Sequence, residues 1–358
     1  MISIRVPRPA FHTLLSVLCL VLALPAMAEV ENDRVEQSVR KALDFLSRGQ
    51  NEQGTFESGP AKAFAGIPAL CGMAYLAAGD TPLSEPNGPT ILRIVDHLLD
   101  KARPEDGYLG VNGGKMYSHC IATLFLSEVS GMVDSNRQER IAQLLPKCVK
   151  LILSAQGVKK DENNRGGWRY EPNSSDSDMS CSGWALMALR SARLNGAPVP
   201  EKAIEDAVGY LLKHQDKHLG TFGYQSTQDH ADKLTGAGLL CLELCGRHGT
   251  PETLRAGSYL AAHYKNLQNP GGGRKLYGLY YTAQALFQIG GPPWKEFSEW
   301  MYDYYIPRQK PEGKWEEGED GCPYYQTALV VLAFTVPYRQ LPIYQRDETV
   351  DDEESKTK

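Results

Sequence analysis

Three short stretches decide the fold: residues 50–56 (QNEQGTF), 215–222 (QDKHLGTF) and 309–315 (QKPEGKW). Each has a glutamine, a glycine a few residues later, and an aromatic residue two positions after the glycine. Glycine adopts the positive φ of a tight turn without steric cost, and an apolar segment follows each stretch. We interpret each stretch as the turn between the two helices of one repeating unit.

The turn recurs in weaker form along the chain, and its glycines mark six units. They are Gly54, Gly107, Gly167, Gly220, Gly272 and Gly313, which lie 41 to 60 residues apart. In the third unit, Gly166 and Gly167 precede Trp168 after a polar insertion at residues 157–165. Six units fill residues 29–346 as one domain and leave no room for a second.

Two kinds of helix alternate along these units. Before each turn, Leu and Ile recur every three or four residues among charges, which is typical of a helix buried on one side; such outer helices are expected at 35–46, 91–99, 141–153, 204–212, 254–264 and 297–305. After each turn the sequence is apolar nearly all round, which predicts inner helices that include 69–76, 121–126, 184–189, 237–244, 281–289 and 327–334. An open solenoid would need polar terminal caps, but the last inner segment is as apolar as the others. We therefore predict an all-α (α/α)6 toroid, or barrel, closed on itself.

The first 28 residues form a separate segment. Arg5 and Arg8 precede an apolar run at 14–24, and Ala26 and Ala28 supply a small-residue cleavage site. The run is too short to cross a bilayer core of about 30 Å as a helix. The pattern predicts a signal peptide at 1–28 that leaves no stable membrane anchor after removal, so we expect an exported protein, periplasmic or extracellular.

Charge and composition narrow the functions further. The 358 residues have a formal net charge of -5 without a basic cluster, so no nucleic-acid partner is expected.

The C-terminal end of the chain has two parts. Residues 338–344 are expected to cross the barrel as an extended strap, and the acidic tail at 347–358 is expected to be solvated and disordered. Of eight cysteines, Cys19 leaves with the signal peptide. An odd number of cysteines remains, and most of them lie in apolar runs. This pattern does not imply a disulfide framework.

The glutamine–glycine–aromatic turns resemble the Gln–Trp repeat motif of terpene cyclases. With the helix pattern, they make residues 29–346 similar to the α-α toroid superfamily of prenyltransferase/squalene-oxidase repeats, which includes terpenoid cyclases and protein prenyltransferases. The segments 167–170, 182–189 and 341–346 resemble exported bacterial members. The resemblance implies a central cavity for a small hydrophobic, isoprenoid-like ligand. It also implies functional residues at the N-terminal ends of the inner helices, where the helix dipole is positive.

Asp176 and Asp178 are the candidate catalytic residues. Residues 176–179 are the nearest match to the Asp-x-Asp-Asp set with which such cyclases protonate an alkene, although Met179 replaces the last acid. An acid that strong needs neighbours that stabilise its conjugate base. The alternative is that the aspartates cap the next helix, because Asp is a favoured N-cap.

Asp320, Cys322 and His119 are the candidate metal ligands. Asp320-Gly321-Cys322 resembles the first half of the prenyltransferase zinc motif, but no histidine follows His263, so His119 of the second unit would complete the set. Zinc accepts this combination of carboxylate, thiolate and imidazole. A capping aspartate and a core cysteine explain the same residues without a metal, and no cofactor is assigned.

Residues near the turns and the inner-helix starts are the candidate ligand-binding residues. We select Tyr117, Trp168, Tyr170, Trp184, Asp229, Asp232, Tyr277, Tyr281 and Tyr324. Cations in the same regions either meet an anion or are solvated at the surface: Lys62, Lys115, Arg169, Lys233, Arg274 and Lys275. Aromatic walls suit a sugar, a carbocation or a packed core.

Three functions stay open at this point. The resemblance favours a protein that binds an isoprenoid-like ligand, with or without transforming it as a terpene cyclase or prenyltransferase does. The alternatives are a non-catalytic binding or scaffold module of the cell envelope, and a carbohydrate-active (α/α)6 enzyme with two carboxylates about 5–9 Å apart. A hollow apolar ring favours a small ligand, and a filled ring favours the scaffold.

Overall fold

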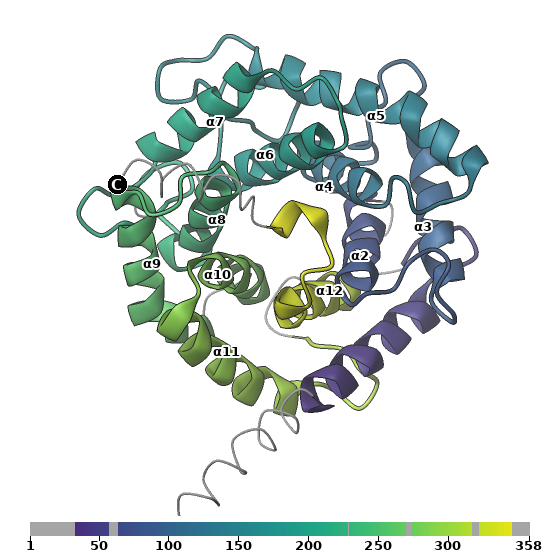
Figure 1. The fold of residues 1–358 in the computed structure, drawn as a ribbon. Helices are drawn as coiled ribbons and strands as arrows, with labels where there is room; N and C mark the ends of the chain where they lie inside the picture. The colour runs from purple at the N-terminus through teal and green to yellow at the C-terminus, as the bar shows by residue number, and fades with distance from the viewer. Residues whose placement is uncertain (1–32, 57–63, 228, 270–273, 317–321, 346–358) are drawn as a thin grey trace, which may run out of the picture.

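The computed structural model describes residues 33–56, 64–227, 229–269, 274–316 and 322–345. Within them, six outer helices surround six inner helices (Figure 1). The outer ring consists of residues 33–49, α3 (Gly88–Lys101), α5 (Ser135–Gln156), α7 (Glu201–Lys213), α9 (Pro251–His263) and α11 (Gly291–Tyr305). The inner ring consists of α2 (Gly66–Ala77), α4 (Lys115–Glu128), α6 (Met179–Leu194), α8 (Ala231–Leu244), α10 (Lys275–Ile289) and α12 (Pro323–Phe334). The described ranges contain no β-strand, and the predicted all-α (α/α)6 architecture is confirmed.

Burial separates the two rings as the hydrophobic pattern predicts. Every residue of α2 is buried, because this helix has the outer ring on one side and other inner helices beside it. In α3, by contrast, Ile91, Ile94 and Leu98 face the core while Asp100 is exposed. The expected signal peptide (1–28) and acidic tail (347–358) lie outside the described residues.

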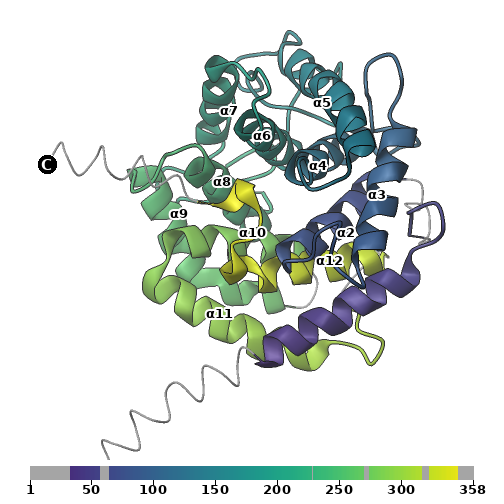
Figure 2. The ribbon, with the colours of Figure 1, turned by 45° about the vertical axis from the view of Figure 1, so that its right-hand side comes forward.

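The ring closes on itself. The last inner helix, α12, contacts both α10 and α2, and Figure 2 shows it beside the first inner helix. In the outer ring, Gln309 Nε2 donates a hydrogen bond to the carbonyl oxygen of Ser38 at 2.9 Å, and Ser38 Oγ donates to Gln309 Oε1 at 2.9 Å. The sixth unit is thus joined to the first, which excludes an open solenoid.

The turn glutamines join neighbouring units in the same way. Gln50 Nε2 donates to the carbonyl oxygen of Thr90 at 3.0 Å, at the start of the next outer helix. Gln215 Nε2 donates to the carbonyl oxygen of Glu252 at 2.9 Å. Each side-chain amide therefore donates to a backbone carbonyl in the first turn of the next outer helix. We call this glutamine, which joins two neighbouring units, the inter-unit clamp.

The third unit has this clamp too, although the sequence pattern hides it. Gln156 Nε2 donates to the carbonyl oxygens of Gly166 at 2.9 Å and Ala203 at 2.8 Å, with the insertion at 157–165 looped out between. The turn glycine is Gly166, with φ of +95°, and the assignment of this role to Gly167 was wrong. A Cβ at Gly166 would lie 2.1 Å from the carbonyl oxygen of Asp206, so the turn requires glycine there.

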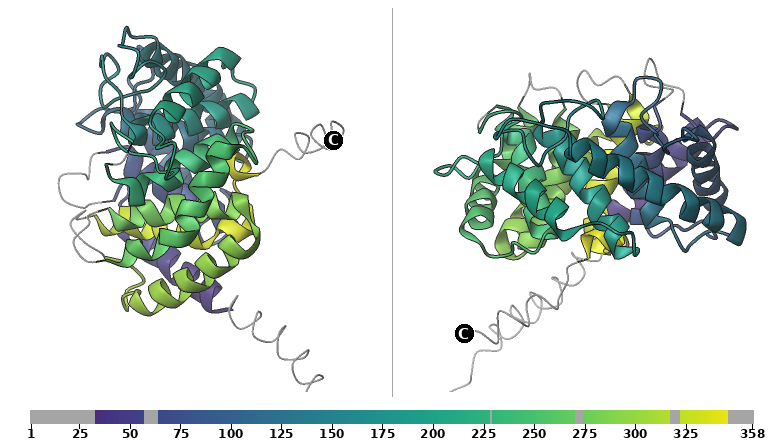
Figure 3. Two further views of the ribbon diagram at one scale, coloured as in Figure 1. Left: turned by 90° about the vertical axis from the view of Figure 1, so that its left-hand side faces the viewer. Right: turned by 90° about the horizontal axis from the view of Figure 1, so that it is seen from above.

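One end of the barrel is closed by the C-terminal segment 336–345, which we call the strap. It forms two short 3-10 helices, η4 (Val336–Tyr338) and η5 (Pro342–Tyr344), rather than the extended segment expected. Gln288 Nε2, near the end of α10, donates to the carbonyl oxygen of Tyr344 at 2.9 Å. The strap lies inside the inner ring in the axial view of Figure 1 and toward one end of the barrel in Figure 3.

The seven cysteines of the described residues are free thiols, six of them buried. Burial raises the pKa of Cys71, so this thiol is protonated at neutral pH and packs as a small apolar side chain. Among the described helices, none combines the length and apolar character that a membrane span requires.

Candidate functional site

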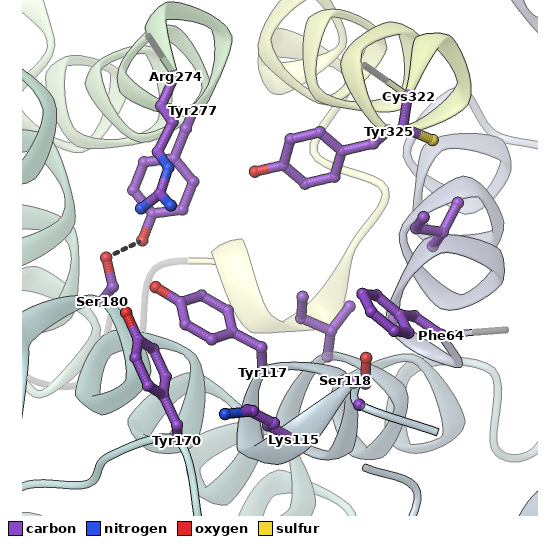
Figure 4. Close-up of a pocket in the computed structure, with 15 residues that line it drawn as sticks. Phe64, Lys115, Tyr117, Ser118, Tyr170, Ser180, Arg274, Tyr277, Cys322 and Tyr325 are labelled. Carbon is purple, nitrogen blue, oxygen red and sulfur yellow. Dashed lines mark hydrogen bonds between the residues drawn. The ribbon is translucent and has the colours of Figure 1, made fainter. Parts of the chain in front are cut away.

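A cavity of about 440 Å³ opens at the N-terminal ends of the inner helices, opposite the strap. Residues at the starts of α2, α4, α6, α10 and α12 surround it (Figure 4). The lining residues are Phe64, Gly66, Ile67, Gly113, Gly114, Lys115, Tyr117, Ser118, Ile121, Tyr170, Ser180, Arg274, Tyr277, Cys322 and Tyr325. This is the end at which the superfamily resemblance places functional residues.

Four tyrosines bring aromatic rings and hydroxyl groups to the cavity: Tyr117, Tyr170, Tyr277 and Tyr325 (Figure 4). The ring centroids of Tyr117 and Tyr170 are 5.9 Å apart, and Tyr277 Oη donates to Ser180 Oγ at 3.1 Å. Burial raises the pKa of both Tyr117 and Tyr277, so their hydroxyls stay protonated over the physiological range. The tyrosines therefore supply apolar faces together with neutral hydrogen-bonding groups.

Two cations, Lys115 and Arg274, lie at this same cavity on opposite helices. Lys115 is the first residue of α4, and Arg274 is the N-cap of α10. The described lining holds no Asp or Glu, so its formal charge is positive. Glu171, beyond the lining, pairs with Lys115 at 3.3 Å between Nζ and Oε1.

The two candidate catalytic aspartates meet at one arginine. Arg169 Nη1 contacts Asp178 Oδ2 at 3.0 Å, and Arg169 Nε contacts Asp176 Oδ2 at 3.1 Å. Asp178 is fully buried and caps α6, since its Oδ1 accepts from the backbone N–H of Cys181 at 2.8 Å. Burial raises the pKa of Asp178 against the opposing effects of this cap and of Arg169. Neither aspartate lines the cavity.

A hydrogen-bonded chain connects this acidic pair to the cavity. Arg169 Nη1 donates to Tyr224 Oη at 2.8 Å, and the hydroxyl of Tyr224 is hydrogen-bonded to that of Tyr170, which lines the cavity. The guanidinium carbon of Arg169 also lies 4.4 Å from the centre of the Tyr170 ring. Asp178 and Arg169 thus fix the orientation of a cavity tyrosine.

The candidate zinc ligands do not come together in the described residues. His119 is fully buried, its Nδ1 accepts from the backbone N–H of Leu109 at 3.2 Å, and its Nε2 lies 3.2 Å from the carbonyl oxygen of Cys148. Burial lowers the pKa of His119 to about 4, so the ring is neutral and ties α4 to its outer neighbour α5. Cys322 lines the cavity, whereas Asp320 lies outside the described residues. The described part of the chain has no group of three His, Cys, Asp or Glu side chains arranged to hold a metal ion.

The other selected residues fall into three places outside the cavity lining. Trp184 and Tyr281 pack against each other in the inner ring, with centroids 5.6 Å apart. Trp168 is buried and donates from Nε1 to the carbonyl oxygen of Ile152 at 2.7 Å. Asp232 is exposed and accepts from Tyr259, while Asp229 accepts from the backbone N–H groups of Tyr224 and Gln225 and from Ser226.

The pair Tyr324 and Tyr325 shows what the sequence does not reveal. Tyr324 stacks on Phe45 of the first outer helix at 5.1 Å, whereas Tyr325 lines the cavity. Because α12 is apolar on every side and buried from Gln326 to Phe334, its sequence has no amphipathic pattern to show which side faces the axis. The same holds for Ile67 and Ile121, two lining residues that we did not select.

No family model matches the sequence, and no curated protein matches it. Solved structures do match. The type II terpene cyclase MstE from Scytonema superposes with a TM-score of 0.59 and 15% identity over 86% of this chain and 99% of that one. The GH76A α-1,6-mannanase of a Salegentibacter species, as an inactive variant in complex with α-1,6-mannotriose, gives a TM-score of 0.59 and 13% identity over 84% and 98%. At these identities the chain shares the α/α toroid fold of the two enzymes.

Proposed function

We propose that this protein is exported and binds a small, mostly apolar, isoprenoid-like molecule in its central cavity. The observation that carries the proposal is the 440 Å³ space at the N-terminal ends of the inner helices, walled by tyrosines, Phe64, Ile67 and Ile121. A cavity of this size and lining is typical of small-molecule sites. A ring that served only as a scaffold would have no need to leave this space open.

The terpene cyclase likeness supports the same class of ligand. MstE has been solved in complex with geranylgeranyl dihydroxybenzoate, its substrate, and that structure matches this chain with a TM-score of 0.57 at 14% identity. A related ligand in this chain would place its hydrocarbon part against the apolar wall. Rings such as Tyr117 and Tyr325 pack well against hydrocarbon and also accept developing positive charge.

We propose binding, rather than proton-initiated cyclisation, as the primary role. Protonation of an alkene requires an acid that touches the ligand, with geometry considered before pKa. Asp176 and Asp178 are both paired with Arg169, and Asp178 caps α6. Their proposed part is to position Arg169 and, through it, Tyr224 and Tyr170. The zinc site built on Asp320, Cys322 and His119 stays a prediction.

A carbohydrate is the second candidate ligand, favoured by the hydroxyl groups of the lining. Four tyrosines and two serines supply hydrogen-bonding groups at the cavity, and the mannanase of the same fold has been solved with mannotriose. Sugars are bound by such combinations of aromatic faces and hydroxyls. The same binding experiment separates the two candidates.

The test starts from the full chain expressed with its own N-terminus. Sequencing of the secreted or periplasmic protein is expected to begin at Glu29, and an uncleaved chain that stays in the cytosol would contradict export. Native mass spectrometry of the purified protein, followed by solvent extraction, is expected to show a co-purifying lipid. Calorimetric titration with farnesol should show saturable binding, whereas binding of mannotriose alone would favour the carbohydrate reading and overturn the proposal.

A further inference from the structure

We infer that a second cavity, beside the strap, binds a small zwitterion of the amino-acid type: a free amino acid or a short peptide with an apolar side chain. Glu243 binds its ammonium group, and Arg190 binds its carboxylate. The site is separate from the central cavity, so the inference goes beyond the proposed function and does not depend on it.

The second cavity has a volume of about 390 Å³ and lies where the C-terminal ends of α6, α8 and α10 meet the strap. It shares no described lining residue with the cavity at the N-terminal ends of the inner helices. Leu194 and Gln345, both in its lining, are exposed. The cavity is therefore reached from the surface at the strap end, and it is much larger than the space that one water molecule needs.

The first argument is the carboxylate of Glu243, which is buried but only half satisfied. Its side chain is 3% exposed, and its Oε2 atom is hydrogen-bonded to Nδ1 of His248. The other oxygen, Oε1, has no hydrogen-bond partner among the described residues. An acceptor left unpaired in the interior costs the desolvation free energy of that group. This carboxylate therefore lacks a donor, and a cationic donor makes the strongest bond to it.

The second argument is Arg190, which lies four residues before the end of α6. Its Nε atom is also buried, and it too has no hydrogen-bond partner in the described part of the chain. Arg190 and Glu243 line the same cavity, yet the ion pair of Glu243 is made with His248 and not with Arg190. A donor and an acceptor of opposite charge thus line one cavity without satisfying each other.

The third argument is what a single molecule must carry to satisfy both groups. An ammonium group donates to Glu243 Oε1, and a carboxylate accepts from the guanidinium of Arg190. Such charge-assisted hydrogen bonds are shorter and stronger than neutral ones. The formal charges of Arg190 and Glu243 cancel, so they match a ligand that has separated charges but no net charge. Amino acids and short peptides have this property.

The rest of the lining selects the side chain and connects the site to the strap. Leu244, Pro342 and Ile343 supply apolar surface, which suits an apolar side chain. Pro342 and Ile343 belong to the strap, whereas Arg190 and Glu243 belong to inner helices. A bound ligand therefore joins the strap to the ring. Because it binds only the folded protein, it raises the unfolding temperature.

Glu128 shows the contrast with a buried carboxyl group that is satisfied within the chain. It lies at the same end of the barrel, where its Oε1 atom accepts from the hydroxyl of Ser191 and its Oε2 atom accepts from the backbone N–H of Ile343. Both oxygens of Glu128 are thus occupied, whereas Glu243 leaves one oxygen unpaired. The missing hydrogen bond is a property of the second cavity and not of every buried carboxyl group at this end.

Four probes separate the two charged groups of the ligand. They are L-leucine, leucyl-leucine, N-acetyl-L-leucine, which lacks the ammonium group, and L-leucinamide, which lacks the carboxylate. In calorimetric titration the wild type is expected to bind L-leucine or leucyl-leucine about tenfold or more tighter than either of the other two, which corresponds to one charge-assisted contact. The amino acid and the dipeptide differ in the separation of their charges and so distinguish the two sources of this chemistry. Saturating farnesol is expected to leave this binding unchanged.

Two variants test the assigned residues. Glu243→Gln and Arg190→Gln each remove one incompletely paired charge, so thermal unfolding without ligand is expected to be unchanged or higher in temperature. Each is expected to bind L-leucine about tenfold more weakly and to lose the ligand-induced rise in unfolding temperature. Arg193→Gln is the matched control, because Arg193 lies on the same helix, pairs with Glu201 and does not line the cavity. Its ligand binding is expected to equal that of the wild type.

The outcomes separate this inference from the proposed function. If no probe binds, or if all four bind the wild type equally, the inference is wrong, and farnesol binding at the central cavity is unaffected. If Glu243→Gln and Arg190→Gln both destabilise the ligand-free protein, the two side chains pair with each other, which also overturns the inference. Arg346 follows Gln345 and lies outside the described residues. Arg346→Gln is expected to bind L-leucine as the wild type does, and a tenfold gain in affinity would make Arg346 the occupant of the site and contradict the inference.

Discussion

The two ends of the barrel are built from the same helices but differ in what fills them. At the N-terminal ends of the inner helices, a cavity of about 440 Å³ remains between the side chains. At the C-terminal ends, the strap occupies the centre, where Tyr344 and Tyr280 are joined through their hydroxyls and the backbone N–H of Ile343 donates to Glu128 Oε2 at 3.2 Å. The difference shows that the axis of the ring is open at the inner-helix starts and occupied by the strap at the other end, where a second cavity of about 390 Å³ lies beside the strap rather than on the axis.

The largest expected effect is on the filled end. Tyr344→Ala removes a buried ring and its hydrogen bond from the strap, and we expect a loss of about 4 kcal/mol in the free energy of unfolding, as for other large buried aromatic side chains. Tyr338→Ala, in the same strap but half-buried, should cost about 1 kcal/mol. Chemical denaturation of both variants makes the comparison, and equal small losses would mean that the strap does not close the barrel.

One substitution made at both ends sharpens the contrast between them. Gly166→Ala at the cavity end would place a Cβ 2.1 Å from the carbonyl oxygen of Asp206, whereas Gly196→Ala at the strap end meets nothing within 4 Å. Both glycines have positive φ, so each change carries the left-handed penalty of about 1 kcal/mol. We expect a total near 3 kcal/mol for Gly166→Ala, because the unit interface must also shift. Urea titrations that gave the two variants the same stability would contradict the clamped-turn account.

The pH dependence of stability is expected to carry a signature of the strap end. Burial raises the pKa of Glu128 to about 7 from 4.5, despite hydrogen bonds from Ser191 and Ile343. Between these values the unfolded carboxyl is ionised while the folded one keeps its proton, so the free energy of unfolding falls as pH rises. The contribution is at most about 3 kcal/mol across that range.

Glu128→Gln isolates this contribution. The difference in unfolding free energy between Glu128→Gln and wild type should grow in favour of the variant from pH 5 to pH 7. Taking the difference removes the opposite contribution of His119, whose lowered pKa makes stability rise with pH in both proteins. If the difference in unfolding free energy between the two proteins did not change with pH, Glu128 would not be the source of the pH dependence.

The smallest effect concerns Asp178 at the cavity end. Asp178→Asn keeps an oxygen for the N–H of Cys181 and loses the charge opposite Arg169, which retains Asp176. We expect a loss of about 1 kcal/mol for Asn and about 2 for Ala, because Asn is as good an N-cap as Asp and Ala is not. Ligand affinity should fall only slightly in Asp178→Asn, because Asp176 still holds Arg169 beside Tyr170. A turnover or affinity that collapsed in a stable Asp178→Asn protein would restore this residue as a catalytic acid.

Much of the fold could be predicted from sequence, because its signals are local and repeated. The turns at Gly54, Gly220 and Gly313 and the alternation of one-sided and fully apolar helices were enough to predict the closed ring. The role of Gln156 as the turn glutamine of the third unit was not predicted, because an insertion separates it from Gly166 and a contact across an insertion is not visible in sequence. The strap was placed correctly across the barrel, but its 3-10 turns were missed.

The site was harder to predict for a physical reason. Inner helices are buried all round, so the axis-facing side of each leaves no periodic signal, and neighbouring residues such as Tyr324 and Tyr325 are indistinguishable. The charged lining residues were easier to predict than the aromatic ones. Lys115 and Arg274 are recognisable at the starts of inner helices because the rest of each helix is apolar. Arg169, Lys233 and Lys275 do not line the cavity, and Lys62 lies outside the described residues, so position near a helix start alone did not separate the cations.

The central claim is that the space at the cavity end is the ligand site, and filling it is the most direct test. Ile121 lines the cavity and is 5% exposed, so Ile121→Trp replaces a branched alkyl side chain with a larger indole ring in that space. Calorimetric titration of this variant with farnesol as the probe is expected to show at least a tenfold loss of affinity, while cooperative thermal unfolding is retained. A folded Ile121→Trp protein that bound the probe as tightly as the wild type would contradict the account.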